Sequence, residues 1–392
     1  MEDFEYRLPT RFIFGHGAEV RVGEAAVSCG ASRALVVYGG GSVVRSGLLD
    51  RVVASCAEAG VSCVRLGGVR PNPQSDLVYT GVELARAGRI DLVLAVGGGS
   101  VIDTAKAIAA GACYKGDVWD FYGGDLVPER ALPVGVVLTI AASGSEASPD
   151  SVITKSETML KRETSSAALL PAFSILDPEL TCTLPAYQTA CGITDMYSHL
   201  LERYLTQSVG VAVSDRMIEG LMLGIIDEAP AVMADPESYG ARANLMWAAT
   251  LAHCDIAGTD RKQDWASHDI EYALSSRYGV AHGAGLAVVM PAVERFYLDE
   301  GRAEARLAQL ARRVWGVDAA DDRAAALAGI EAQRAFFAFL GMPGTLGDIG
   351  GCAEDVEALA QETCHAGGRS GTVGGFMPLD EAAVAKILTL AL

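Results

Sequence analysis

Four short runs of aliphatic residues in the first half of the chain constrain the fold most. They read "RALVVYGG" (33–40), "VSCVRLGG" (61–68), "DLVLAVGGG" (91–99) and "LPVGVVLTI" (132–140). Their length and their β-branched residues predict buried strands. The segments between them, such as "GLLDRVVASCAEAG", repeat apolar residues at helical spacing. Strands that alternate with helices predict a parallel sheet covered on both faces.

The strand-like runs stop near residue 185, and the rest of the chain has the pattern of helices. Segments rich in Ala and Leu follow one another, with Gly or Pro at their joints. The chain has 392 residues, half of them apolar, which is more than one ordinary compact domain needs. We therefore predict an α/β domain over residues 1–185 and an all-helical domain over residues 186–392.

The composition excludes several classes of partner. With 31 basic and 49 acidic residues the net charge is −18, which disfavours binding to nucleic acid or anionic lipid. The longest apolar runs are shorter than the roughly 20 residues that span a bilayer, and the acidic N-terminal segment does not resemble a signal peptide. The nine cysteines form no CxxC pair, which indicates free thiols in a reducing cytoplasm.

A glycine-rich turn follows the third predicted strand, in "AVGGGSVIDTAKAIAAG" (95–111). Glycines allow a ligand to approach the backbone, and the N-terminus of the following helix favours an anion. Ser100 adds a hydroxyl donor. The spacing is not that of the GxGxxG fingerprint. Two interpretations stay open, a phosphate-binding turn or a turn that only packs helix against strand.

A second glycine-rich turn, "VVYGGGSVVRSG" (36–47), follows the first predicted strand. Folds that select NAD often carry an acidic residue at this strand end, to bind the ribose 2′-hydroxyl. Here Gly40, Gly41 and Ser42 stand in its place, and Arg45 follows. Space beside a cation suits the 2′-phosphate of NADP. The alternative is an ordinary loop with a solvated arginine.

Four residues of the helical half have the side chains and spacing of a metal site. They are Asp195, His199, His268 and His282. The first two stand at i and i+4, so on a helix they share one face. One carboxylate and three imidazoles suit Fe2+ or Zn2+.

Taken together, these motifs resemble the iron-containing (group III) alcohol dehydrogenases over nearly the whole chain. The markers are "GGGSVIDTAKAIA", "TIAASGSEAS", "SILDPELTCTLP", "GITDMYSHLLERYL" and "HDIEYALSSRYGVAHGAGLAVVMP", in this order. The "YGGGS" turn, "DWASHDIEYALS" and "GGFMPLDEAAVAKIL" look most like the NADPH-dependent butanol dehydrogenase or aldehyde reductase branch. The resemblance implies a Rossmann-like N-terminal domain that binds the dinucleotide and a helical domain that binds metal and substrate.

The resemblance also implies roles for individual residues. The metal positions of the family fall on the four residues named above. Its cofactor-contact positions fall on Gly40, Gly41, Ser42, Asn72, Gly98, Gly99, Ser100, Asp103, Thr139, Ser143, Lys161 and Thr181. Tyr272 stands where the family commonly has a histidine with a proton-relay or substrate role. A phenol titrates far higher, near about 10 when unperturbed, so Tyr272 is either a different proton donor or a packing residue.

The function that follows is reduction of a small aldehyde to its primary alcohol, or the reverse, by a cytoplasmic homodimer that prefers NADP(H) and holds one divalent metal. A lyase of the dehydroquinate synthase type shares the expected architecture. It would need many cations for a polyanionic substrate, and the segment from Asp195 to His282 offers few. Glycerol dehydrogenase and maleylacetate reductase are alternatives within the same class. A regulator that has lost catalysis is disfavoured, because all four metal positions are kept.

Overall fold

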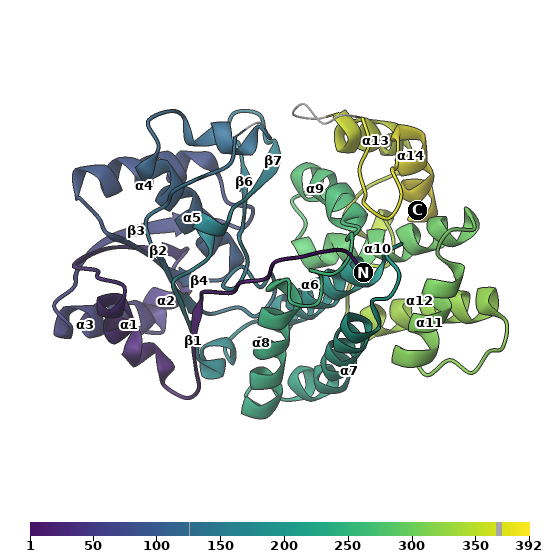
Figure 1. Ribbon diagram of the computed structural model, residues 1–392, viewed down its shortest axis with the longest axis horizontal. Helices are drawn as coiled ribbons and strands as arrows, with labels where there is room; N and C mark the ends of the chain where they lie inside the picture. Colours follow the sequence, from purple (N-terminus) through teal and green to yellow (C-terminus); the bar gives the residue numbers. More distant parts are fainter. Residues whose placement is uncertain (125, 366–370) are drawn as a thin grey trace. The chain divides into compact units, whose positions relative to one another are not determined.

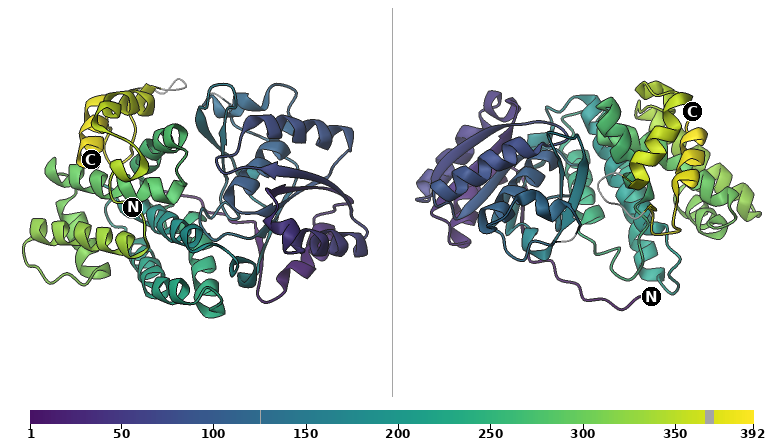
Figure 2. Two further views of the ribbon diagram at one scale, coloured as in Figure 1. Left: turned by 180° about the vertical axis from the view of Figure 1, so that it is seen from behind. Right: turned by 90° about the horizontal axis from the view of Figure 1, so that it is seen from above.

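A computed structural model describes residues 1–124, 126–365 and 371–392 of the chain. The chain divides into two compact units (Figures 1 and 2). The α/β unit comprises Arg7–Leu184 and Glu237–Cys254, and the helical unit comprises Met1–Tyr6, Pro185–Pro236 and Asp255–Leu392. Among the described residues, no helix is long and apolar enough to cross a membrane.

The α/β unit is built on a six-stranded sheet in which all neighbouring strands are parallel. Its order is β1 (Arg11–Phe14), β8 (Phe173–Leu176), β5 (Val134–Leu138), β4 (Leu92–Gly97), β2 (Arg33–Gly39) and β3 (Ser62–Val69). The four predicted strands are β2, β3, β4 and β5. The short strands β1 and β8, at one side of the sheet, were not predicted. A hairpin of β6 (Asp150–Thr154) and β7 (Lys161–Ser165) forms a separate antiparallel sheet.

Helices cover both faces of this sheet (Figure 1). Leu35 and Val37 of β2 belong to the core that packs against α4 (Ser75–Ala87) and α5 (Gly99–Cys113). Ala34 and Val36 belong to the opposite core, with α1 (Val22–Ser28) and α3 (Leu48–Glu58). Alternate residues of this strand therefore pack into two different cores, which explains why its sequence is apolar throughout. The shorter helices of this unit are η1 (Ala18–Arg21), α2 (Ser42–Arg45), η2 (Val118–Tyr122), η3 (Ala167–Leu169) and η4 (Pro178–Thr181).

The helical unit packs around α10 (His282–Asp299), which is buried from Gly283 to Leu298 apart from Arg295. A helix buried along nearly its whole length belongs in the middle of a domain. It contacts α6 (Ala186–Tyr204), α9 (Ala266–Tyr278), α12 (Asp322–Phe339) and α14 (Glu381–Leu390). The remaining helices are α7 (Ala212–Ala234), α11 (Glu304–Val314), α13 (Val356–His365), η5 (Gly347–Ile349) and η6 (Ala353–Asp355).

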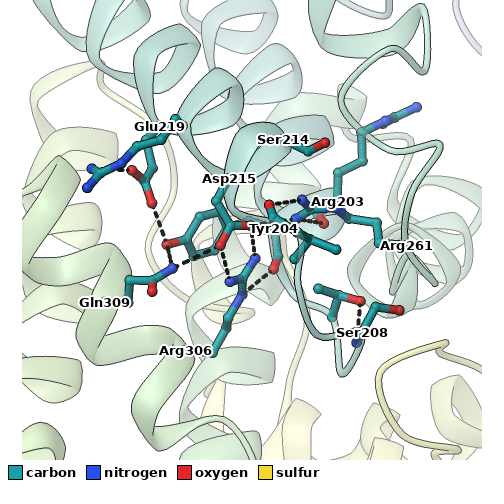
Figure 3. Close-up of polar contacts among 12 residues, drawn as sticks. Arg203, Tyr204, Ser208, Ser214, Asp215, Glu219, Arg261, Arg306 and Gln309 are labelled. Atoms are coloured by element: carbon teal, nitrogen blue, oxygen red, sulfur yellow. Dashed lines mark hydrogen bonds and ion pairs between the residues drawn. The ribbon is translucent and has the colours of Figure 1, made fainter. Parts of the chain in front are cut away.

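A buried ionic network fixes the C-terminal end of α6 (Figure 3). Asp215 of α7 accepts hydrogen bonds from Arg261 and Arg306. Arg261 also donates to the carbonyl of Arg203 in the last turn of α6. Tyr204, the last residue of α6, donates to Glu219 at 2.8 Å. Each buried charge therefore has an opposite charge or a hydrogen bond, as burial requires.

The observed units differ from the predicted division at 185/186 in two segments. Helix α8 (Tyr239–His253) belongs to the α/β unit. There Met246 joins the core, the Trp247 ring meets that of Phe12 edge-on, and Thr250 donates to Glu146 at 2.7 Å. Met1–Tyr6 belongs to the helical unit, where the amide of Glu2 donates to the carbonyl of Asp260. Helical periodicity reports that a helix has an apolar face but not which core receives it.

Candidate metal centre and cofactor-binding turns

The four predicted metal ligands lie together in the helical unit. Asp195 and His199 come from α6, His268 from α9, and His282 begins α10. Asp195 Oδ1 lies 3.6 Å from His199 Nε2 and 3.9 Å from His282 Nε2. The His268 ring is 4.9 Å from the His199 ring and 5.0 Å from the His282 ring, between centroids. One possible ligand atom from each of Asp195, His268 and His282 falls within 4.8 Å of the other two.

Two glutamates that the sequence reasoning missed support these imidazoles. The Nδ1 atom of His268 is hydrogen-bonded to the carboxylate of Glu202, and that of His282 to the carboxylate of Glu271. A carboxylate on Nδ1 holds the proton there and leaves the Nε2 lone pair for a metal. The spacing held a signal, because Glu202 follows His199 by three residues, and Glu271 follows His268 by three. On a helix, that spacing places both side chains on the ligand face.

The donor set fits a divalent cation. Among the described residues, Asp195 Oδ1 and His268 Nε2 are buried atoms without a hydrogen-bond partner. Asp195 and His268 are only 5% and 6% exposed. A buried carboxylate oxygen and a buried imidazole nitrogen, left without partners and close together, carry a desolvation cost that a bound cation offsets. One carboxylate with three imidazoles is a donor set for Fe2+ or Zn2+.

Two glycines allow α10 to approach the helices that carry the other candidate ligands. A Cβ on Gly283 would lie 2.1 Å from the carbonyl oxygen of Cys191 in α6. A Cβ on Gly285 would lie 2.8 Å from Glu271 in α9. Any larger residue would push His282 away from Asp195. The motif "AHGAG" (281–285) is therefore explained by packing around the ligand cluster.

Tyr272 of α9 lies at the edge of this cluster. Its ring centroid is 6.1 Å from that of His282, with the rings inclined by 31°. The side chain is half-buried. Tyr272 is therefore close enough to take part in chemistry at the cluster, and its role stays a prediction.

The first glycine turn of the α/β unit joins β4 to α5. Gly98 is the extended residue before α5, and Gly99 and Ser100 form the first turn of this 15-residue helix. A Cβ on Gly99 would lie 2.4 Å from Ser143 Oγ, so Ser143 lies against the turn. The amide of Thr139, directly after β5, donates to the carbonyl of Gly97 at 3.0 Å. These residues form one group at the carboxyl ends of neighbouring parallel strands, where dinucleotides bind in such folds.

The second glycine turn lies at the same edge of the sheet, because β2 is the neighbour of β4. Gly40 and Gly41 follow β2, and Ser42 begins α2. The Arg45 guanidinium folds back over the turn, since a Cβ on Gly41 would lie 3.1 Å from Arg45 Nη1. The turn therefore combines a glycine backbone, a hydroxyl and a cation.

The remaining predicted cofactor residues are more scattered. Asn72 has a positive φ of 51° in the loop between β3 and α4. Thr181 is buried at the end of η4, and its hydroxyl donates to the carbonyl of Pro178. Lys161 begins β7, in the separate hairpin. Asn72 and Thr181 follow strands of the main sheet, and Lys161 does not.

Asp103 of α5 is turned toward the protein. Its Oδ1 accepts from Ser145 at 2.7 Å and its Oδ2 from the amide of Val152 at 3.2 Å. Lys106, one turn later, donates to Ser145 and to the carbonyls of Ser148 and Asp150. Burial raises the pKa of Asp103 to about 6 despite the nearby Lys106 ammonium. Asp103 therefore holds the segment that follows Ser143 in place. Its contact with the cofactor, which the resemblance implies, stays a prediction.

Comparison with known proteins identifies the family. Residues 9–178 match the iron-containing alcohol dehydrogenases, and residues 189–392 match the C-terminal region of the Fe-containing alcohol dehydrogenase family. The chain belongs to the iron-containing alcohol dehydrogenase family, as its motifs predicted. The predicted fold class, an α/β part followed by a helical part, is also confirmed.

The relatives include enzymes named for either nicotinamide cofactor. The probable NADH-dependent butanol dehydrogenase 1 of Bacillus subtilis (strain 168) is 41% identical, covering 100% of both chains. The NADPH-dependent aldehyde reductase YqhD of Escherichia coli (strain K12) is 38% identical, covering 92% of this chain and 93% of that protein. The crystal structure of NADH-dependent butanol dehydrogenase A from Thermotoga maritima is 38% identical and has a TM-score of 0.95, covering 100% of this chain and 99% of that one.

Proposed function

We propose that this protein is a metal-dependent alcohol dehydrogenase that interconverts a small aldehyde and its primary alcohol. The observation that carries the proposal is a pair of buried atoms without a hydrogen-bond partner, Asp195 Oδ1 and His268 Nε2. With His282 they offer three ligand atoms within 4.8 Å of one another, and the ring of His199 stacks on that of His268. The names of the relatives, butanol dehydrogenases and an aldehyde reductase, support this substrate class.

The metal-holding residues in this proposal are Asp195, His199, His268 and His282. When bound, a divalent cation supplies a Lewis acid that polarises the carbonyl oxygen, and a reduced nicotinamide supplies the hydride. Glu202 and Glu271 hold the Nδ1 protons of His268 and His282, which keeps the Nε2 atoms available at the cluster. The donor set suits Fe2+ and Zn2+ alike. Metal analysis of the purified protein decides between them.

Tyr272 is proposed as the group that donates a hydrogen bond or a proton to the substrate oxygen. Its position beside the His282 ring supports this role. The hydroxyl is the only polar group of a tyrosine side chain. Tyr272→Phe removes this hydroxyl and keeps the ring, so it tests the chemistry without changing the packing. A packing role for Tyr272 is the alternative that this replacement tests.

The α/β unit is proposed to bind the dinucleotide, with the pyrophosphate at the first turn of α5. Gly98, Gly99 and Ser100 offer amides at the N-terminus of a long helix, and Thr139 and Ser143 lie beside them. Asn72, Lys161 and Thr181 are proposed as outlying contacts.

NADP(H) is proposed as the preferred cofactor. Gly40, Gly41 and Ser42 place no carboxylate at the end of β2, and Arg45 brings a cation over the turn. A 2′-phosphate gains charge-assisted hydrogen bonds from such a site. The relatives do not decide the matter, since their names include both NADH and NADPH.

We also propose a cytoplasmic homodimer. All nine cysteines are free in the structure, which suits a reducing compartment. Light scattering of the purified protein during gel filtration tests the dimer, and fractionation of cells tests the location.

One experiment tests the main proposal. The purified protein is given NADPH or NADH with a panel of short aldehydes, and metal is measured on the same preparation. We expect oxidation of the cofactor that requires both an aldehyde and bound metal. His268→Ala should lose metal and turnover together, whereas the exposed His365→Ala should keep both. Normal turnover by metal-free His268→Ala would overturn the mechanism.

A further inference from the structure

Trp265, directly before α9, has an unfavourable backbone conformation. Its φ of 70° and ψ of 8° are in the left-handed region, where a bulky residue is rare. Such a conformation persists only where surrounding contacts enforce it, and it is often found near functional sites. His268 stands three residues later. The conformation of Trp265 therefore bears directly on where the first turn of α9 places a candidate metal ligand.

The Trp265 ring lies against two of the candidate ligands. Its centroid is 5.1 Å from that of His268, in an edge-on arrangement, and 5.9 Å from that of His199. The same two imidazoles stack on each other. The indole therefore limits rotation of both rings, in addition to the carboxylate of Glu202 that holds His268.

Three further side chains hold the indole in place. The Arg203 guanidinium lies over its face at 4.7 Å, and Arg203 also donates to the carbonyl of His199 at 3.2 Å. The indole N–H donates to Gln263 Oε1 at 3.1 Å. Gln263 in turn donates to Asp255 Oδ1 at 2.6 Å, and Asp255 faces Arg203 at 3.5 Å. Arg203, Asp255, Gln263 and Trp265 thus form a closed set of contacts, here called the Trp265 cluster.

We propose that Trp265 is a positioning residue of the metal centre, which fixes the His199 and His268 imidazoles and thereby slows the loss of the metal. The inference rests on the proposed metal site. Ligands held in their binding orientation lose less conformational freedom when the ion binds, and an apolar wall limits access of water to the ion. The Trp265 cluster serves this purpose at the cost of a strained backbone.

Substitutions at Trp265 distinguish the effect of the indole ring from the effect of the backbone strain. Trp265→Gly removes the ring and relieves the strain, because glycine adopts positive φ freely. Trp265→Asn also tolerates this conformation and serves if the glycine variant folds poorly. Trp265→Phe keeps an aromatic ring. The matched control is Trp315→Phe, because Trp315 packs on Tyr197 and Phe336 instead of on the candidate ligands.

The main measurement is the rate at which a chelator removes Zn2+ or Co2+ from the loaded protein. We expect about a 10- to 100-fold faster release from Trp265→Gly and Trp265→Asn, with Trp265→Phe close to wild type. The visible spectrum of the Co2+-loaded protein should change in the first two variants only. The thermal unfolding of each metal-free variant is measured as well, because faster metal release from a variant that is still folded at the temperature of the assay separates positioning from a general loss of stability.

The outcomes distinguish this inference from the proposed function. In the first case, the wild type binds metal and His268→Ala does not, so the metal site stands. If Trp265→Gly and Trp265→Asn then release the metal at the wild-type rate and the Co2+ spectrum is unchanged, the proposed role of Trp265 is wrong. If His268→Ala binds metal as tightly as the wild type, the metal site is wrong, and the inference fails with it.

Discussion

Glu271 is hydrogen-bonded through its carboxylate to Nδ1 of His282, while Nε2 of the same imidazole lies 3.9 Å from Asp195 Oδ1. Glu271 is fully buried. A carboxylate in this position orients the ring and increases its basicity as a ligand. Glu271 is not a ligand in the proposal, but through His282 it should raise the affinity of the proposed site for its metal.

Replacing Glu271 with Gln should weaken metal binding without removing it. The amide keeps the volume of the side chain but has no negative charge to support the imidazole. We expect an affinity about 10- to 100-fold lower, measured by competition with a chromogenic chelator. Glu357→Gln, on an exposed position of α13, serves as the control. Unchanged metal affinity in Glu271→Gln would show that the carboxylate has no part in tuning the site.

Replacing Tyr272 with Phe should lower turnover while metal content stays normal. If the phenol donates a proton to the substrate oxygen, kcat should fall by about 100-fold and the pH profile of kcat should change. Steady-state kinetics across a pH series, with metal measured on each sample, checks this. Wild-type kinetics at every pH would assign Tyr272 to packing.

Replacing Arg45 with Ala should change the choice of cofactor. Loss of a cation over Gly41 removes a charge-assisted contact to a 2′-phosphate and leaves NADH unaffected. We expect the ratio of kcat/KM for NADPH to that for NADH to fall by about 10-fold or more. Ser42→Asp should act in the same direction, because a carboxylate repels the phosphate. If the ratio stays the same in both variants, the turn is an ordinary loop.

The pH dependence of stability should contain a contribution from Glu294, in the buried part of α10. Burial raises its pKa to about 8, although Gln333 donates to it at 2.6 Å. The folded pKa exceeds the unfolded value of about 4.3, so the folded protein binds the proton more tightly. Stability from this group is therefore complete below about pH 4 and is lost as the pH rises toward 8.

Glu294→Gln should remove this dependence. Gln carries no titrating proton and can still accept from Gln333. At about pH 9 we expect the variant to unfold about 2–4 °C above the wild type, with the difference vanishing below about pH 4. Thermal unfolding followed by circular dichroism checks this, with the exposed Glu300→Gln as control. A constant difference across the pH range would mean that Glu294 is not the titrating group.

Much of the α/β unit was readable from local patterns. The runs that became β2, β3, β4 and β5 are apolar throughout because both faces of these strands are covered. The strands β1 and β8 have only four residues each, too few for a clear pattern, and their pairing depends on contacts across more than 150 residues. The place of α8 in the α/β unit could not be predicted for the same reason. Its contacts there are with Phe12 and Glu146, which are distant in sequence.

The candidate site divides in a similar way. Asp195, His199, His268 and His282 were singled out because histidines are few and two of the four residues share a helix face. Glu202 and Glu271 also stand at helical spacing from His199 and His268, but glutamates are common on helices, so the spacing alone does not distinguish them. Trp265 offered no signal, since nothing in a sequence reports a positive φ at a tryptophan. The contact of Asp103 with the cofactor stays a prediction, and only the structure shows that its two oxygens accept hydrogen bonds from Ser145 and the amide of Val152.

The sequence by itself determined the kinds of elements, the family and the residues able to bind a metal, because these depend on residue type and on spacing along the chain. Only the tertiary structure decided which of those residues meet, which carboxylates stand behind the imidazoles and why Trp265 is held in a strained conformation. Those features arise from long-range packing, in which Gly283 and Gly285 bring α10 against α6 and α9. Local periodicity cannot report the distance between helices that are far apart in the chain.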